Sequence, residues 1–332
     1  METTRRGFIG AVGALGAMAG DGMLSMAHAS GTGDWPHRQP IKLIMPHAPG
    51  GPTDVVARTL APHIGTALGQ TLFVESRVGA SGNIGTEYVA RAAPDGYTVL
   101  YQTSGLAIMP ALFRKLPYDP LAGFAPVAMP ADINVILLVR NSLPVADLSS
   151  FLQYLKDHPG KLSYGSGGRG NITHLAVEVL LRQLGSSAVH VPYKGTAPAM
   201  VDLLGGQIDF MLDAINTAYP YVKDGRVRAL AVTGGNRSPL LPQLPTVAEA
   251  GVPGYAMSTW QCMLVPAGTP ASIVQALNAA VNKAVADPDL QKQFAAVGVQ
   301  LQSSTPAQLE ARLRADIPNW IKVAQAAGVQ PE

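Results

Sequence analysis

Short runs of apolar and β-branched residues alternate with helical patterns along this chain, and this alternation constrains the fold more than any other feature. The first run, residues 41–45, is followed by prolines and glycines and then by apolar residues at helical spacing. Repetition of such a unit predicts an α/β protein built from parallel βαβ units. The expected strands are 41–45, 72–75, 98–102, 135–139, 189–191, 208–212, 227–232 and 261–265. Apolar residues from Ile172 to Leu180 predict a helix that ends at Gly185.

The length of the chain predicts two domains. Its 332 residues exceed the roughly 250–300 residues at which a single hydrophobic core stops growing. Two extended apolar stretches, 133–140 and 260–266, are expected to cross between the domains. This gives a first lobe of residues 40–139 plus 262–332 and a second lobe of residues 140–261, with a ligand cleft between them.

Composition excludes several classes of protein. Hydrophobic residues make up 47% of the chain, which excludes a disordered protein. The 24 Lys and Arg residues are nearly balanced by 22 Asp and Glu residues, so a nucleic-acid partner is not expected. Cys262 is the single cysteine, which excludes an internal disulfide and a cysteine-based metal centre. We expect no cofactor, because the sequence contains no recognised cofactor motif.

The first 29 residues resemble an export signal. Arg5 and Arg6 precede an apolar, Gly- and Ala-rich run over residues 10–26, and Ala27-His28-Ala29 supplies a small-x-small cleavage site. The alternative is a membrane anchor, but Gly20-Asp21-Gly22 interrupts the run before it reaches the roughly 20 residues that a membrane span needs. The sequence therefore predicts a twin-arginine signal peptide over residues 1–29 and a periplasmic mature protein.

The segment from Pro46 to Asp54 lies between a predicted strand and a predicted helix. Its glycines allow close backbone approach to a ligand, Pro52 and Thr53 suit a helix start, and first-turn N–H groups lack partners within the helix. This pattern predicts an anion site. It lacks the lysine of a Walker A loop and the spacing of a dinucleotide fingerprint. A purely structural turn is the alternative interpretation.

Five further strand-to-helix loops carry Gly, Ser, Thr or Asn, at 79–85, 102–105, 163–174, 191–196 and 212–217. Together they predict one cleft that binds an anion through helix starts and neutral donors. A carboxylate fits better than a phosphate, because only Arg169 and Lys194 supply positive charge in these loops and both are expected to be solvated. Asp54 is expected to cap its helix, with contact to a ligand donor as the alternative. For Asp213 the two roles remain equally open.

Enzyme motifs are absent from the sequence. There is no G-x-S-x-G, no H-E-x-x-H and no paired Cys and His spacing, so the chain is predicted not to be an enzyme. His47 and His174 would face the cleft, yet no activated nucleophile stands beside either. We expect each to serve in hydrogen bonding or packing.

Seven ordered motifs over nearly the whole mature chain are similar to those of the extracytoplasmic solute receptors of tripartite tricarboxylate transporters, also called Bug-type receptors. They are PHAPGGPTD at 46–54, APDGYTVL at 93–100, PYDP at 117–120, FAPV at 124–127, VPYKG at 191–195, DLLGGQID at 202–209 and LPTVAEAG at 244–251.

The resemblance implies a type II periplasmic-binding-protein fold, in which two α/β lobes close on a small organic acid for membrane transporter subunits. The oligomeric state is left open, with a monomer as the default expectation for a receptor that closes about a hinge. The resemblance assigns ligand binding to main-chain amides and hydroxyls of both lobes. The implied residues are Gly50, Gly51, Pro52, Thr53, Asp54, Ser81, Gly82, Asn83, Thr103, Ser104, Ser166, Gly167, Gly168, Asn171, Thr173, His174 and Asp213. The chain departs from the family pattern at His47 and at Ser76, Val78 and Ser81 around Arg77.

Two rival functions remain at this stage. A receptor of the same class could report to a membrane sensor, and an extracytoplasmic enzyme could use His47 or His174. The identity of the acid is left open among dicarboxylates, tricarboxylates, aromatic acids and amino acids.

Overall fold

The computed structural model describes residues 34–326 and 328–331, so the predicted signal peptide lies outside the described residues. The strands are β1 Ile41–Met45, β2 Leu72–Ser76, β3 Thr98–Thr103, β4 Phe124–Val139, β5 Ser163–Ser166, β6 Val189–Pro192, β7 Phe210–Ala214, β8 Arg228–Val232, β9 Ser258–Pro266 and β10 Val299–Leu301. The helices are α1 Pro52–Leu68, α2 Asn83–Ala90, α3 Gly105–Leu112, α4 Leu148–Asp157, α5 Ile172–Leu184, α6 Thr196–Leu204, α7 Ile215–Lys223, α8 Ala271–Val285, α9 Pro288–Ala295 and α10 Pro306–Ala326, with a short 3₁₀ turn at Ala80–Gly82. This confirms the predicted α/β class.

The strands form one mixed sheet in the order β2-β1-β3-β9-β4-β7-β5-β6, and β8 and β10 pair with β4 outside this path. β1 pairs in parallel with β2 and β3, as the βαβ pattern predicted. β5 pairs in parallel with β6 and β7, but β5 was not among the expected strands, because its residues were assigned to the loop 163–174. β4 and β9 run antiparallel to each other and to their other neighbours. The antiparallel centre of the sheet was not expected from the sequence.

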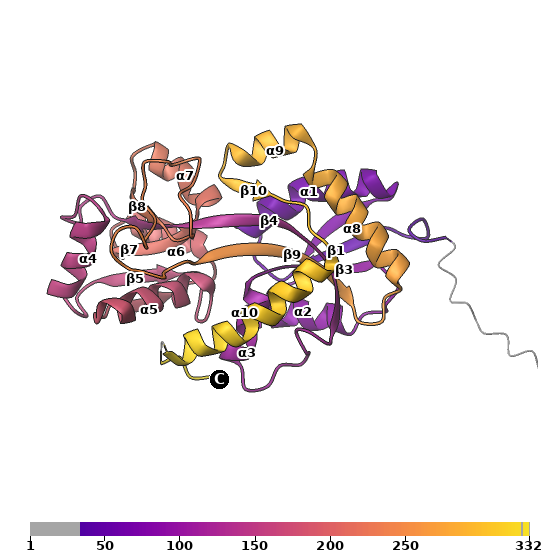
Figure 1. Cartoon of the computed structure of the whole chain (residues 1–332), viewed down its shortest axis with the longest axis horizontal. Helices are drawn as coiled ribbons and strands as arrows, with labels where there is room; N and C mark the ends of the chain where they lie inside the picture. The colour runs from indigo at the N-terminus through magenta and orange to yellow at the C-terminus, as the bar shows by residue number, and fades with distance from the viewer. Residues whose placement is uncertain (1–33, 327, 332) are drawn as a thin grey trace, which may run out of the picture. The chain divides into compact units, whose positions relative to one another are not determined.

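β4 and β9 run between two groups of strands (Figure 1). Residues 124–134 of β4 pair with β9 and β10, whereas residues 135–139 pair with β7 and β8. We therefore use "first lobe" for the part that contains β1, β2 and β3, and "second lobe" for the part that contains β5, β6, β7 and β8. The sequence-based limits of the lobes, at 139/140 and 261/262, stay a prediction.

β4 is much longer than its predicted strand, which covered only residues 135–139. Pro126 and Pro130 lie in the missed part, and a proline lacks the N–H that a sheet ladder uses. The pairing with β9 shifts register between Pro126 and Ala128 and again between Ala128 and Ala131. These irregularities accommodate the prolines. β7 begins two residues later than predicted, and the short β10 was not predicted.

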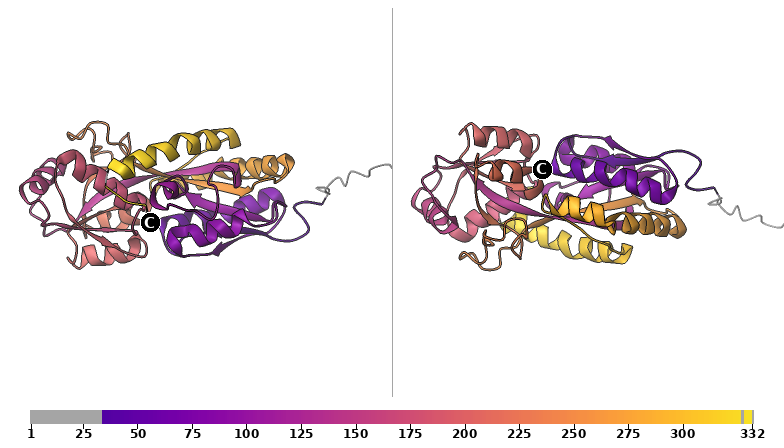
Figure 2. Two further views of the ribbon diagram at one scale, coloured as in Figure 1. Left: turned by 90° about the horizontal axis from the view of Figure 1, so that it is seen from below. Right: turned by 90° about the horizontal axis from the view of Figure 1, so that it is seen from above.

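Helices cover both faces of the first-lobe strands. α1 and α8 pack on one face, where Val56, Leu60 and Ile64 of α1 are buried with β1. α3 and α10 pack on the other face, where Leu309 and Leu313 of α10 are buried. Figure 2 shows the indigo α1 and the yellow α10 on opposite sides of the strands. No helix among the described residues is long and apolar enough to span a membrane.

Local sequence signals place the helix starts that border the site. Gly51 precedes α1 in an extended conformation, Pro52 takes the first helical position, and Gly69 ends the helix with φ of 67°. Asn171 caps α5 by accepting a hydrogen bond from the Thr173 N–H at 3.0 Å, and Gly185 ends α5 with φ of 62°. The predicted helix before Gly185 is therefore confirmed.

The contact between α2 and the loop after β1 depends on Gly85. A Cβ at this position would lie 2.7 Å from the carbonyl oxygen of Arg77 and 2.9 Å from the Cβ of Pro46. We expect Gly85→Ala to lower the free energy of unfolding by about 1–3 kcal/mol, because the backbone atom cannot move aside cheaply. Urea unfolding measures this effect. Gly205→Ala is the control, since its Cβ would meet nothing closer than 3.4 Å, and equal effects of the two variants would contradict the packing argument.

Candidate functional site

The predicted site loops of the first lobe lie at one edge of the sheet. They follow β1, β2 and β3, which are parallel neighbours, so their carboxyl ends point the same way. Gly50 and Ser81 are exposed there, and Gly51, Pro52 and Thr103 are half-buried. The edge thus presents mainly glycine backbone and hydroxyl groups.

Asp54 holds the loop that precedes α1. Its Oδ2 accepts a hydrogen bond from the Gly50 N–H at 3.0 Å, and its Oδ1 pairs with Arg58 Nε at 2.6 Å. Both Asp54 and Thr53 are buried. These contacts are those of a carboxylate that supports a helix start, which was the favoured interpretation of Asp54.

A chain of side-chain hydrogen bonds joins the three first-lobe loops. His47 Nε2 lies 2.6 Å from Gln102 Oε1, and Gln102 Nε2 donates to Thr86 Oγ1 at 3.1 Å. Thr86 Oγ1 in turn donates to the Gly82 carbonyl at 2.8 Å. Because an amide oxygen only accepts, His47 carries its proton on Nε2 in this arrangement. Burial lowers the pKa of His47, and the hydrogen bond to Gln102 opposes this effect.

The turn that leads into α2 holds an unusual backbone conformation. Ala80 and Ser81 have positive φ values of 45° and 57°, which non-glycine residues adopt at a cost. Gly82 and Asn83 are buried, and Asn83 Oδ1 accepts a hydrogen bond from Tyr118 at 2.6 Å. The exposed Ser81 is therefore held in place by buried neighbours on one side.

Thr103 and Ser104 end β3 in contact with their own lobe. Thr103 Oγ1 accepts a hydrogen bond from the Gly105 N–H at 3.1 Å at the start of α3. Ser104 is buried, and its Oγ lies 3.3 Å from Thr259 Oγ1 of β9. The structure thus gives both hydroxyls a role in holding the end of β3.

The loop from Ser166 to Asn171 in the second lobe is held from within. The buried Ser166 Oγ accepts from the Gly168 N–H at 3.2 Å, and Thr173 Oγ1 accepts from the Gly167 N–H at 2.9 Å. Gly167 and Gly168 remain half-buried. Side chains therefore fix this loop, in which Arg169 is exposed and Gly170 is buried.

Aromatic rings stack behind the same loop. The His174 and His190 rings lie 4.0 Å apart between centroids, and Tyr164 stacks on His190 at 4.9 Å. His174 Nδ1 accepts from the Gly170 N–H at 3.0 Å, and Ser166 Oγ lies 2.6 Å from His190 Nε2. Burial lowers the pKa of each histidine to about 4, and the charge of Arg169 acts in the same direction. Both rings are therefore neutral near pH 7.

Asp213 lies at the end of β7, where its carboxylate ties together the second-lobe helix starts. Its Oδ1 accepts from the Ala214 N–H at 2.8 Å and its Oδ2 accepts from Thr217 Oγ1 at 3.0 Å. Burial raises the pKa of Asp213 to about 6, whereas the hydrogen bonds, including one with Thr196, oppose that rise. The structure supplies contacts for the capping role and shows no ion pair of Asp213 among the described residues.

Two contacts bring the loops of the two lobes together. Asn216 Nδ2 of α7 donates to the Pro52 carbonyl of α1 at 3.4 Å. A Cβ at Gly170 would lie 2.0 Å from Leu112 Cδ1 of α3, so this glycine lets the two lobes approach closely. The predicted loops of the second lobe therefore meet those of the first lobe.

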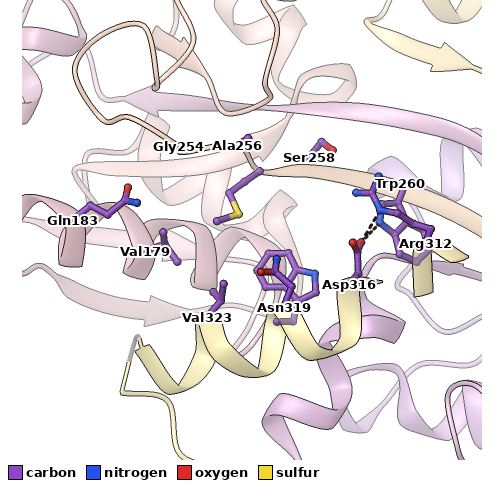
Figure 3. A pocket seen from close by; sticks show the side chains of 12 residues that line it. Val179, Gln183, Gly254, Ala256, Ser258, Trp260, Arg312, Asp316, Asn319 and Val323 are labelled. Carbon is purple, nitrogen blue, oxygen red and sulfur yellow. Dashed lines mark hydrogen bonds and ion pairs between the residues drawn. The ribbon is translucent and has the colours of Figure 1, made fainter. Parts of the chain in front are cut away.

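A pocket of 270 Å³ lies elsewhere in the molecule and contains none of the predicted site residues. Residues of α5, of the segment before β9 and of α10 line it (Figure 3). Asp316 accepts hydrogen bonds there from Trp260 Nε1 and from Arg312 Nε, each at 2.8 Å. No group of three or more metal-ligating side chains is found among the described residues.

Sequence reasoning missed several residues at the predicted site. Asn216 stands in a loop that was identified, yet it was not chosen. The rule that groups strand-to-helix loops would have found it, because it follows Asp213 in the first turn of α7. Gln102 likewise stands in an identified loop, 102–105, and was not chosen. Thr86, Leu112 and His190 carry no such signal, since their roles come from contacts distant in the sequence.

Comparison with known proteins identifies the family. Residues 56–328 match the model described as the tripartite tricarboxylate transporter family receptor. The chain belongs to this family. The protein BugT of Bordetella pertussis is 34% identical over 294 residues, which cover 88% of this chain and 90% of BugT. The family consists of periplasmic solute-binding receptors, as the sequence motifs indicated.

Solved structures of two Rhodopseudomonas palustris proteins share the fold of this receptor. R. palustris Rpa4515 with adipate superimposes with a TM-score of 0.85 at 35% identity, covering 90% of this chain and 100% of that one. MatC with bound malate gives a TM-score of 0.80 at 35% identity, covering 86% of this chain and 99% of MatC. The periplasmic-binding-protein fold that the resemblance implied is therefore confirmed.

The stacked histidines predict a loss of stability in acid. The folded-state pKa of each histidine lies below the value near 6.5 of an unfolded chain. The contribution of the neutral rings to the free energy of unfolding is therefore present above pH 6.5 and is lost as the pH falls toward 4. For the buried His174 this amounts to about 3 kcal/mol. We expect a His174→Gln/His190→Gln protein to show a clearly shallower fall in the free energy of unfolding over this range. An unchanged pH profile in urea unfolding would contradict the assignment.

The raised pKa of Asp213 predicts a pH dependence of the free energy of unfolding that is opposite to that of the histidines. The folded-state pKa of Asp213 lies above its unfolded value. The contribution of the protonated carboxyl to the free energy of unfolding is therefore fully present below pH 3.8 and is lost as the pH rises through about 6. Relative to Asp213→Asn, the wild-type protein should therefore lose up to about 3 kcal/mol of unfolding free energy between pH 4 and pH 7.5. Urea unfolding of both proteins without ligand measures the difference. A difference that does not change with pH would show that Asp213 is not desolvated.

Proposed function

We propose that this receptor captures a small carboxylate between its two lobes and delivers it to membrane subunits of a tripartite tricarboxylate transporter. The capture occurs by hinge closure, because contacts from both lobes to one ligand exist only when the lobes are shut. The crossing segments at 139/140 and 261/262 serve as the hinge. Residues 1–29 direct the chain to the periplasm through the twin-arginine route, and the mature receptor acts as a monomer.

One observation carries the proposal: the predicted strand-to-helix loops follow two groups of parallel strands, and the two groups of loops contact each other through Asn216 and Pro52. Helix starts and free backbone N–H groups stabilise an anion. A carboxylate fits this arrangement without a cluster of cations. Relatives with bound adipate and malate support the same class of ligand for this chain.

Catalysis is not part of the proposed function. His47 and His174 make no hydrogen bond to a hydroxyl or a thiol among the described residues. The Ser166 hydroxyl that contacts His190 is buried and also hydrogen-bonded to Gly168, so it serves the shape of the loop. A bound acid that is recovered unchanged after prolonged incubation would support this conclusion, and a product would contradict it.

The direct test is a search for the bound acid. Native mass spectrometry of the gently purified mature protein should show a carboxylate adduct. A thermal-shift screen against mono-, di- and tricarboxylates should show one class that stabilises strongly, since a ligand at about 100 times its Kd adds about 2.7 kcal/mol. Failure of every acid to bind would overturn the proposal.

Gly51→Asp tests the position of the ligand carboxylate. Gly51 has φ of −82°, and a Cβ at this position would meet no atom closer than 3.6 Å, so a side chain fits without strain. An aspartate at this helix start supports the fold but repels the acid, so we expect at least a tenfold rise in Kd, equal to about 1.4 kcal/mol. Gly51→Asn is the control of equal size without charge. Equal affinities of the two variants in calorimetric titration would refute this location.

A further inference from the structure

The two ends of the Asn216 side chain have different surroundings. Its amide nitrogen donates to the Pro52 carbonyl at 3.4 Å and so reaches from the second lobe to the first. Its Oδ1 is buried and has no hydrogen-bond partner among the described residues. Buried acceptors without partners are rare in native proteins, because losing the hydrogen bond to water is unfavourable. Oδ1 is therefore poised to accept a hydrogen bond from a group that enters the site.

The position of Asn216 indicates which part of a bound ligand would contact it. Pro52 is the first residue of α1, and the start of this helix is the proposed site of the ligand carboxylate. The bond to Pro52 fixes the planar amide of Asn216, so Oδ1 lies close to the same helix start. A carboxylate bound there brings its neighbouring carbon toward Oδ1. Only a substituent that donates a hydrogen bond satisfies this oxygen.

The charges around Asn216 favour a neutral donor. Asp213 precedes it by three residues, but its two oxygens accept from the Ala214 N–H and from Thr217 within the second lobe. Asp54, two residues after Pro52, is paired with Arg58. Both carboxylates thus accept hydrogen bonds within their own lobe and neither is hydrogen-bonded to Asn216, although no cation is paired with Asp213 among the described residues. A hydroxyl group suits an uncharged amide oxygen better than an ammonium group, whose charge would need a carboxylate partner.

We propose that Asn216 recognises a hydroxyl group on the carbon next to the bound carboxylate, so that the receptor selects 2-hydroxy acids over the corresponding unsubstituted acids. This inference rests on the proposed function, because it needs a carboxylate at the start of α1. It assigns Asn216 two tasks: the amide nitrogen joins the lobes, and the amide oxygen distinguishes the ligands.

The test compares acids that differ by one hydroxyl. Calorimetric titration of the mature protein uses the pairs lactate and propionate, malate and succinate, and 2-hydroxyadipate and adipate. In each pair that binds, we expect the hydroxy acid to bind at least about tenfold more tightly. Asn216→Ala should bring the two affinities to within about twofold. Loss of the bond to Pro52 weakens both acids of a pair alike, so their ratio isolates the contribution of Oδ1.

Asn141→Ala is the matched control. Its amide nitrogen also donates to a backbone carbonyl, that of Gly225 at 2.7 Å, just beyond the other end of α7. This variant should keep the preference for the hydroxy acid. Thermal unfolding checks that both variants fold.

Four results would overturn the inference. Equal binding of both acids by the wild-type protein, or a preference that survives Asn216→Ala, removes the role of Oδ1 while the proposed function stands. Tighter binding of aspartate than of malate would show that Asn216 recognises an ammonium group instead of a hydroxyl group. Binding of no acid in any pair overturns the proposed function itself, and the inference falls with it.

Discussion

The pairing of β4 with β9 is the constraint on which the arrangement of the site depends. β4 pairs with β9 over residues 124–134 and with β7 and β8 over residues 135–139, so one strand orients both parallel groups. The loops that follow β1, β2 and β3, and those that follow β5, β6 and β7, take their directions from this shared centre. Because the carboxyl ends of parallel strands meet at one edge, each lobe offers a set of loops rather than a single one.

Within those loops, polar side chains mostly stabilise the backbone. Asp54, Ser166, Thr173 and Asp213 all accept hydrogen bonds from N–H groups of their own lobe. Gly50 stays exposed and Gly51, Gly167 and Gly168 stay half-buried, whereas Gly82 and Gly170 are buried. Recognition of an anion by fixed amides needs little reorganisation, and it tolerates different groups at the far end of the ligand. Such a division suits a family whose solved members hold acids as different as adipate and malate.

Burial shifts the pKa values of the titratable groups beside the second-lobe loops in the direction that favours their uncharged forms. Burial lowers the pKa of His174 and His190 and raises the pKa of Asp213, so the two kinds of group respond to acid in opposite directions. At neutral pH the histidine stack carries no charge, whereas Asp213, with a pKa of about 6, is mostly ionised. Asn216 of the second lobe adds a neutral side chain, whose amide nitrogen donates to the first lobe and whose amide oxygen has no partner among the described residues.

The sequence by itself determined the α/β class, the parallel groups of strands and the family, because periodicity, turn residues and ordered motifs are local properties of the chain. It also located the loops at the strand ends, but it missed β5, which it assigned to a loop, and residues 124–134 of β4. Prolines hide that part of β4, and irregularities in its pairing with β9 accommodate them. Tertiary structure alone decided which side chains hold the loops and which residues meet across the lobes. Gln102 with His47, Leu112 with Gly170 and Asn216 with Pro52 are pairs separated by 55 or more residues, and no local pattern specifies them. Such contacts depend on the order of the strands in the sheet. That order exists only in the folded chain.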